Sequence, residues 1–168
     1  MYTICNFLEN IIKFLTMKIK ILYWKLKYGK RIKIGKKISF RKKLIINISK
    51  NGYLEIGDNN FFNNYCSINC HKKIKIGNDN LFGENVKIYD HSHIFNDNSV
   101  NIRKSYKDRE IYIGNGNWFG SNVTLLSKSK IGNKNVVGAN VVINEAVEND
   151  TLINNVNEHK KEEIIRRN

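Results

Sequence analysis

Apolar residues recur at every sixth position between Ile113 and Ile143, a spacing that neither an α-helix nor an ordinary β-strand produces. The unbroken run consists of Ile113, Phe119, Leu125, Ile131, Val137 and Ile143. A coil with three flat faces of six residues each would direct these residues into its interior. The pattern therefore predicts a triangular prism, in which glycines such as Gly114 and Gly120 let the chain bend at the corners.

The same spacing recurs upstream in shorter blocks, which extends the predicted coil over residues 31–150. The blocks are Ile34, Phe40 and Ile46; Ile56, Phe62, Ile68 and Ile74; and Ile76, Phe82 and Ile88. Small or branched residues suit a second inward position, four residues after an apolar one: Cys66, Val86, Val123, Ser129 and Val141. We predict an all-β fold, a parallel β-helix built of hexapeptide repeats.

The repeat is interrupted at two places. Its register slips by two residues between Ile74 and Ile76, and by one between Ile88 and Ile113 across a polar stretch. We interpret residues 90–110 as a loop extruded from the coil. Loops on a rigid scaffold often carry binding and catalytic residues, so this loop is the first place to look for chemistry.

The two ends of the chain do not follow the repeat. Residues 1–30 carry apolar residues at helical spacing among many lysines, which predicts a cationic amphipathic helix with a candidate break at Thr16. This helix either caps the open end of the coil or packs on a partner subunit, or it lies on an anionic membrane; these roles are compatible. Residues 151–168 are predicted to form a charged tail with a short helix.

The composition fits one domain of 168 residues with a formal net charge of +14. Such a charge attracts nucleic acid, anionic lipid or phosphorylated substrates. We expect no nucleic-acid partner, because the lysines are spread over outward positions and no recognition motif is present. The chain lacks proline and is rich in Asn, Lys and Ile, which we attribute to an AT-rich genome.

The three cysteines, Cys5, Cys66 and Cys70, do not form a disulfide framework. No small-residue cleavage site follows the first apolar stretch, and no window approaches about 20 uncharged apolar residues. We therefore expect a reducing cytoplasmic location, peripheral at the inner membrane face if the amino-terminal helix binds lipid.

Two histidines stand together in the interrupted region, in the stretch Tyr89-Asp90-His91-Ser92-His93. In an extended segment His91 and His93 project to the same side. A basic stretch follows them, with Arg103, Lys104, Lys107 and Arg109. Histidine is the most common general base near neutral pH, so this arrangement suits acyl transfer to a hydroxyl group.

The segment from about Gly52 to Ile143 resembles the hexapeptide-repeat O-acetyltransferases, especially the maltose and galactoside acetyltransferases and the sugar O-acetyltransferases of capsule and lipopolysaccharide biosynthesis. Four ordered stretches carry the resemblance: Ile56–Ile68, Asn85–His93, Ile113–Val123 and Val137–Ala139. It implies a left-handed coil, acetyl-CoA as the acyl donor, and a homotrimer with its cleft between neighbouring subunits. No metal is expected.

The resemblance also assigns roles to single residues. His93 corresponds to the catalytic histidine, with His91 as the second choice. Residues implied in acceptor binding are Asn63, His71, Asn85 and Trp118. Residues implied along coenzyme A are Trp118, Gly120, Ser121, Gly138 and Ala139. The family pattern is lost at Asn144-Glu145 and at residues 154–157, where the adenine end of the coenzyme would be held.

The expected function is therefore acetyl transfer to a sugar hydroxyl, on a capsular, lipopolysaccharide or other surface glycan or its precursor. Two alternatives stay open. One is a structural or scaffold β-helix without catalysis. The other is a zinc enzyme similar to γ-class carbonic anhydrase, although His91 and His93 are closer in sequence than its ligands require.

Overall fold

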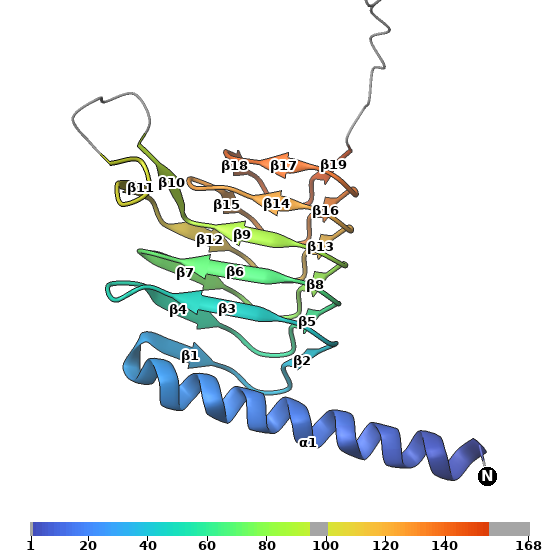
Figure 1. The fold of residues 1–168 in the computed structure, drawn as a ribbon. Helices are drawn as coiled ribbons and strands as arrows, with labels where there is room; N and C mark the ends of the chain where they lie inside the picture. The colour runs from blue at the N-terminus through green and yellow to red at the C-terminus, as the bar shows by residue number, and fades with distance from the viewer. Residues whose placement is uncertain (1, 95–100, 155–168) are drawn as a thin grey trace, which may run out of the picture.

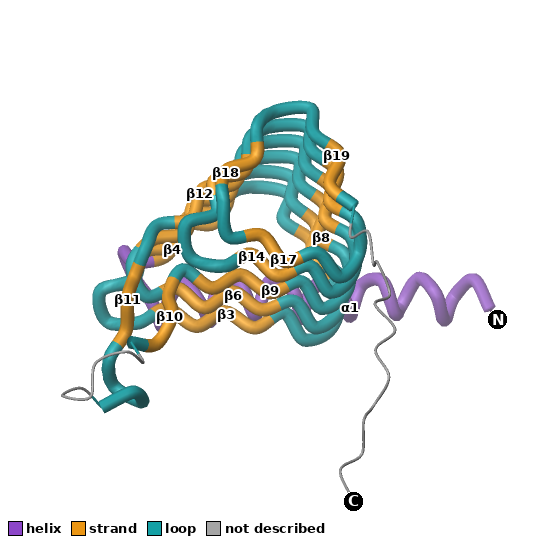
Figure 2. Tube along the Cα trace, turned by 90° about the horizontal axis from the view of Figure 1, so that it is seen from above, coloured by secondary structure: helices purple, strands orange, loops and turns teal. Residues whose placement is uncertain are grey.

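The computed structural model describes residues 2–94 and 101–154, except for the side chains of residues 2–5 and 10. The chain winds into a three-sided prism of parallel strands, with one long helix across its amino-terminal end (Figure 1). Seen from the opposite end, the chain runs clockwise around the prism while it rises toward the viewer (Figure 2). This is the left-handed coil that the resemblance implies.

Each side of the prism is one parallel sheet, and one strand from each sheet makes up a rung. The first face contains β1 (Ile32–Ile34), β4 (Tyr53–Ile56), β7 (Lys73–Ile76), β12 (Ile111–Ile113), β15 (Lys130–Ile131) and β18 (Ala146–Val147). The second contains β2 (Ser39–Phe40), β5 (Phe61–Phe62), β8 (Leu81–Phe82), β13 (Trp118–Phe119), β16 (Val136–Val137) and β19 (Leu152–Ile153). The third contains β3 (Ile45–Ile48), β6 (Ser67–Cys70), β9 (Lys87–Tyr89), β14 (Thr124–Leu125) and β17 (Val142–Ile143).

The residues of the six-residue repeat form the core. Phe62, Phe82 and Phe119 are at most 1% exposed and stack along the axis, with successive ring centroids 4.5 and 5.0 Å apart. The predicted second inward positions are also buried: Cys66, Val86, Val123, Ser129 and Val141. The prediction of a β-helix core is therefore confirmed.

The rungs shorten from the amino-terminal end upward, and the extra residues of the wide lower rungs explain the slip of register between Ile74 and Ile76, whereas the hairpin causes the slip between Ile88 and Ile113. Partners in adjacent rungs lie 22 residues apart at the base, for example Lys33 and Glu55, and then 20 residues apart. Above the loop the separation falls to 18 and then to 16 residues. The wide lower rungs have four-residue strands such as β6, in which Ile68 and Cys70 both point inward.

Asparagine side chains form a buried ladder along the corner between the first and second faces. Asn60, Asn80, Asn117 and Asn135 are at most 1% exposed, and each of the first three accepts a backbone N–H of the next rung at 2.9–3.0 Å. The ladder ends at Asn135, whose Oδ1 accepts the Thr151 N–H at 2.7 Å and whose Nδ2 has no partner among the described residues. The abundance of asparagine thus has a structural role, which corrects its interpretation as genome composition alone.

The glycines of the repeat allow close packing of rungs rather than an unusual bend. A Cβ atom on Gly114 would lie 2.4 Å from the Gly132 carbonyl oxygen, and one on Gly120 would lie 2.7 Å from the Ala139 nitrogen. Most left-handed corner positions are instead occupied by other residues, such as Asn122 with a φ of 62°. The prediction that glycine supplies bending at the corners is therefore wrong for Gly114 and Gly120.

The amino-terminal helix α1 (Tyr2–Tyr28) lies across the first rung and projects beyond the prism (Figure 1). Trp24 and Tyr28 are buried against the open end of the coil, and the Tyr28 hydroxyl donates to the Ile46 carbonyl at 2.8 Å. The helix continues through Thr16, whose hydroxyl bonds to the Ile12 and Lys13 carbonyls, so the candidate break there is wrong. A 3₁₀ turn, Gly29–Arg31, leads into β1.

Within the described ranges, no helix combines the length and hydropathy needed to cross a bilayer. The short helix predicted within residues 151–168 lies largely outside the described residues, which end at residue 154.

The predicted extruded segment is a hairpin between β9 and β12. Its strands, β10 (His91–His93) and β11 (Tyr106–Asp108), pair antiparallel and project from the corner between the third and first faces (Figure 2). The Arg109 N–H donates to the Asp90 carbonyl at 2.7 Å and closes the base of the excursion. Rung pairing continues beneath it, since β7 pairs directly with β12.

Replacing Asn80 with alanine tests the buried ladder. It leaves the Asn117 N–H and the Gly114 carbonyl without their partner. A buried unpaired polar group costs roughly 1–3 kcal/mol, so the free energy of unfolding in urea should fall by about 2–4 kcal/mol. Asn78→Ala in the exposed ladder is the matched control and should cost less than about 1 kcal/mol, because water can replace its bond to the Asp58 N–H. Equal losses would contradict a special role for the buried ladder.

Candidate active site

The base of the hairpin is fixed by one buried carboxylate. Asp90 is fully buried and accepts the backbone N–H groups of His71, Lys72 and Lys73 at 2.7, 2.8 and 2.9 Å. These donors belong to the corner of the rung below. A buried carboxylate needs such compensation, and here it locks the start of the hairpin onto the preceding corner.

Three histidines gather around Tyr106 at this corner. The rings of His71 and His91 stack with centroids 3.6 Å apart, and the Tyr106 ring meets them at 4.5 and 5.6 Å. His93 lies 4.6 Å from the same tyrosine ring. The structure thus brings together His71, His91 and His93, which lie on two different rungs.

Carboxylates orient the two stacked histidines. The Nδ1 of His91 lies 3.3 Å from the Asp90 carboxylate, and the Nδ1 of His71 lies 3.4 Å from that of Asp108. Burial lowers the pKa of His91 below its usual range, and the contact with Asp90 opposes this effect. His91 is therefore held largely neutral near pH 7, and its ring lines the neighbouring cavity described below.

His93 is exposed, and its hydrogen bonding fixes the form of its ring. Its Nδ1 lies 2.6 Å from the Ile102 carbonyl oxygen, which can only accept a hydrogen bond. The neutral ring therefore carries its proton on Nδ1 and leaves the lone pair of Nε2 free. A general base requires this arrangement.

A cavity of about 300 Å³ opens beside the histidine cluster on the third face. His71 and His91 form one side of it, and Lys27 and Tyr28 at the end of α1 form another. Amide and hydroxyl groups from the lower rungs complete the lining: Asn47, Ser49 and Asn69. These amide and hydroxyl groups suit a hydroxyl-rich ligand, Ile48 adds apolar surface, and His93 is not among the lining residues.

The residues implied along coenzyme A lie elsewhere on the same chain. Trp118 is 54% exposed on the second face, in β13. Gly120 and Gly138 stack at the corner between the second and third faces, and Ser121 and Ala139 are exposed beside them. The third face lies between this corner and the hairpin (Figure 2). One chain therefore does not bring Trp118 and these glycines to His93.

The two asparagines implied in acceptor binding also lie at this second corner. The Asn63 side chain is half-buried and accepts the N–H of Asn64 at 2.8 Å. The Asn85 amide donates to the Asn122 side chain at 2.8 Å, so it belongs to an outer asparagine ladder. Asn63 occupies the same position of the corner as Gly120, two rungs lower. Asn85, by contrast, already has a structural partner in Asn122.

Sequence reasoning missed the groups that hold the histidines. Tyr106 and Asp108 come from the returning strand of the hairpin, and nothing in the repeat indicates that this strand pairs with His91–His93. Asp90 had a detectable signal, because an acidic residue directly after the last buried position before the extruded segment needs several donors. The carbonyl of Ile102 leaves no signature in a sequence.

The two described thiols are unsuited to nucleophilic chemistry. Cys66 and Cys70 are buried, and burial raises the pKa of Cys66 to about 11 and that of Cys70 to about 12. Both thiols stay protonated near neutral pH. Within residues 2–94 and 101–154, no group of three or more His, Cys, Asp or Glu side chains is placed to hold a metal ion.

A left-handed three-sided coil of parallel strands is the fold that hexapeptide repeats form. Residues 110–145 match the family described as bacterial transferase hexapeptide (six repeats). No curated protein sequence matches the chain.

Solved structures extend the comparison beyond the matched repeats. A hexapeptide-repeat-containing acetyltransferase from Vibrio cholerae superposes with a TM-score of 0.64 at 29% identity, over 71% of this chain and 66% of that one. The same enzyme in complex with acetyl coenzyme A gives a TM-score of 0.66 at 26% identity, over 80% and 71% of the two chains. A maltose O-acetyltransferase from Clostridium difficile 630 gives 0.64 at 26% identity, over 73% and 64%.

The chain spans 66% and 64% of the length of two of these structures. The predicted resemblance to hexapeptide-repeat acetyltransferases is confirmed.

The depressed pKa of His91 predicts a dependence of stability on pH. Because the unfolded chain binds this proton more tightly than the folded one, stability should be highest above the unfolded pKa of about 6.5 and should fall as the pH drops below it. The groups that face His91 are His71, Tyr106, Asp90 and Asp108. Urea unfolding at several pH values should show a weaker loss below pH 6.5 in His91→Gln than in the wild type. An identical pH profile in both proteins would refute this assignment.

Proposed function

We propose that this protein is an O-acetyltransferase that transfers the acetyl group of acetyl-CoA to a sugar hydroxyl, with His93 as the general base. The observation that carries the proposal is the bond from His93 Nδ1–H to the Ile102 carbonyl, which leaves Nε2 unprotonated at an exposed position. The similarity to an acetyltransferase solved with acetyl coenzyme A and to a maltose O-acetyltransferase supports the donor and the acceptor class.

The mechanism is direct transfer within a complex of both substrates. His93 Nε2 takes the proton of the acceptor hydroxyl as its oxygen attacks the thioester carbon. A backbone N–H on the wall of the coil stabilises the oxyanion of the tetrahedral intermediate. The intermediate collapses to the ester and expels the coenzyme A thiolate, which takes the proton back from His93. The buried thiols of Cys66 and Cys70 take no part.

We propose that a homotrimer completes the site. His93 and the corner that bears Trp118, Gly120 and Ser121 lie on opposite sides of the third face, so one chain cannot present both to one substrate pair (Figure 2). In a closed ring, the hairpin of one subunit faces the coenzyme wall of its neighbour. Gly138 and Ala139 extend that wall one rung upward.

We further propose that α1 holds the protein on an anionic membrane at the cytoplasmic face. Six residues spaced three or four apart form a stripe on the side of α1 opposite the buried Trp24, and each is 52–77% exposed: Leu8, Ile12, Leu15, Ile19, Leu22 and Leu26. Lysines flank this stripe on both sides, as in helices that lie in a membrane interface. A surface glycan or its lipid-borne precursor would be presented there as the acceptor.

Replacing His93 with alanine tests the catalytic assignment. The variant should fold and form the same oligomer as the wild type, measured by light scattering, because His93 is exposed and outside the core. Acetyl transfer, followed by release of free coenzyme A thiol with sugar acceptors, should fall by about 10²–10⁴-fold. Ser92→Ala on the same strand is the control and should keep its activity. Near-wild-type rates of acetyl transfer in His93→Ala would contradict the assignment of His93 as the general base.

Two leucine or isoleucine to serine substitutions in the stripe test membrane binding. Leu15→Ser with Ile19→Ser removes exposed apolar surface without touching the face of α1 that packs on the prism. Co-flotation with vesicles containing phosphatidylglycerol should weaken about tenfold or more. The control, Leu81→Ser with Leu152→Ser, removes exposed apolar surface from the second face and should float like the wild type. Equal flotation of all three proteins argues against the membrane role of α1.

A further inference from the structure

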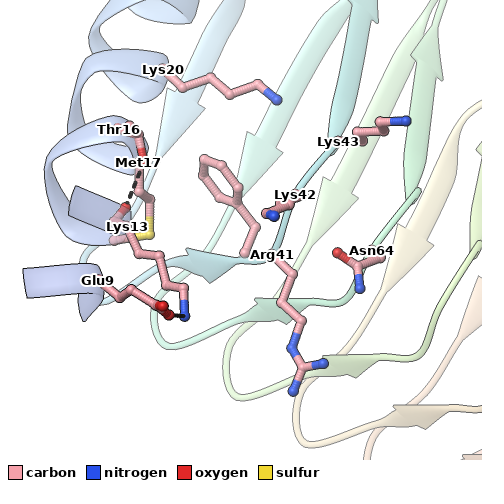
Figure 3. Close-up of a pocket in the computed structure, with 10 residues that line it drawn as sticks. Glu9, Lys13, Thr16, Met17, Lys20, Arg41, Lys42, Lys43 and Asn64 are labelled. Atoms are coloured by element: carbon pink, nitrogen blue, oxygen red, sulfur yellow. Dashed lines mark hydrogen bonds and ion pairs between the residues drawn. The ribbon is translucent and has the colours of Figure 1, made fainter. Parts of the chain in front are cut away.

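A second cavity, of about 790 Å³, lies between α1 and the first rung of the prism (Figure 3). The helix contributes one wall with Glu9, Lys13 and Lys20, and Phe40 of β2 with the turn after it, Arg41–Lys43, contributes the other. Asn64, after β5 on the next rung, also lines the cavity. Lys20 extends from the helix toward the first rung, and three consecutive basic residues, Arg41–Lys43, project from the turn (Figure 3). The mechanism proposed above uses none of these cations.

The positive charge of this cavity is not balanced. Its one carboxylate, Glu9, already pairs with Lys13 at 3.3 Å. Among the described residues, Lys20, Arg41 and Lys42 have no carboxylate within ion-pair distance. The Lys20 ammonium instead lies 5.3 and 5.5 Å from the Trp24 and Phe40 ring centroids, and its burial lowers its pKa. A bound anion would relieve this desolvation cost.

The cavity adjoins the acceptor position of the proposed function. Arg41 lies directly below Asn63 in the stacked corner, since its N–H donates to the Phe62 carbonyl at 2.9 Å. Lys42 lies below Asn64, which itself lines the cavity. Neighbouring rungs are about 4.8 Å apart, so these cations lie within the length of one sugar from Asn63.

We propose that this cavity binds the phosphate of a phosphorylated acceptor, a sugar carried on a phosphate or diphosphate group. The guanidinium of Arg41 is a planar fork that matches phosphate oxygens, and Lys20 and Lys42 line the same cavity and add positive charge to it. The preference for an anion follows from the cations of the cavity alone, whereas the phosphorylated sugar that carries it rests on the function proposed above. The same phosphate chemistry can come from a soluble glycosyl phosphate or from a lipid-borne one. The membrane-facing stripe of α1 favours the lipid-borne source.

Binding of inorganic diphosphate to the full-length protein tests the cavity directly. Calorimetry at physiological ionic strength should show saturable binding, and Arg41→Gln with Lys42→Gln should weaken it about tenfold or more. The control is Lys36→Gln with Lys37→Gln, which removes the same charge from exposed residues of the same rung but outside the cavity. It should change the affinity less than about twofold. Absence of binding by the wild type, or equal losses in both variants, would overturn the proposal.

Two further experiments determine whether the phosphate is lipid-borne or soluble, and test the phosphate site separately from the proposed function. Vesicles of phosphatidylcholine with phosphatidic acid present a lipid-borne phosphate. Weaker flotation of the cavity variant than of its control supports a lipid-borne acceptor, and equal flotation of the two supports a soluble glycosyl phosphate. Acetyl transfer to a sugar and to its 1-phosphate is then compared. The inference is supported if the cavity variant has a higher KM than the wild type for the sugar 1-phosphate but not for the unphosphorylated sugar. It is overturned if the two proteins have equal KM values for the sugar 1-phosphate. Diphosphate binding without any acetyl transfer would reject the function and retain the phosphate site.

Discussion

Backbone hydrogen bonds hold the rungs of this prism about 4.8 Å apart, and the rest of the chain is arranged around that spacing. It leaves no room for a Cβ atom at position 114, where the Gly132 carbonyl lies directly above, so a glycine is required there. It allows an asparagine amide to reach both neighbouring rungs, as Asn80 does. It also leaves the first rung without a partner below, and α1 covers that end with Trp24 and Tyr28.

The six-residue period made the core predictable, because burial of every sixth side chain is a local property of the repeat. Phe119 and Val123 could be placed inward from spacing alone, and the interrupted register located the loop that bears His93. The role of Asn80 was hidden, since a ladder depends on which residues meet between rungs that differ in length. Tyr106 was hidden for a similar reason: its contacts arise from antiparallel pairing inside the excursion.

The candidate chemistry is divided between two corners of one molecule. The hairpin corner supplies the proposed base, His93, whose tautomer is set by a backbone carbonyl, and Asp90 holds the start of the hairpin in place. The other corner carries a column of small residues above and a basic cavity below, with Asn63 between them. In the proposed trimer, donor, acceptor hydroxyl and acceptor phosphate would follow one another down a single line parallel to the prism axis.

The hairpin lengthens one rung to 37 residues, yet Ile76 and Ile113 pair across it as closely as any other neighbours in the first face. The pairing of the rungs is therefore unaffected by the insertion at this corner, provided that Asp90 and Arg109 still close its base. The hairpin can therefore differ in length or sequence without changing the pairing of β7 with β12 around it. The residues of the proposed chemistry are thus carried by an insertion, whereas the core is carried by the repeat.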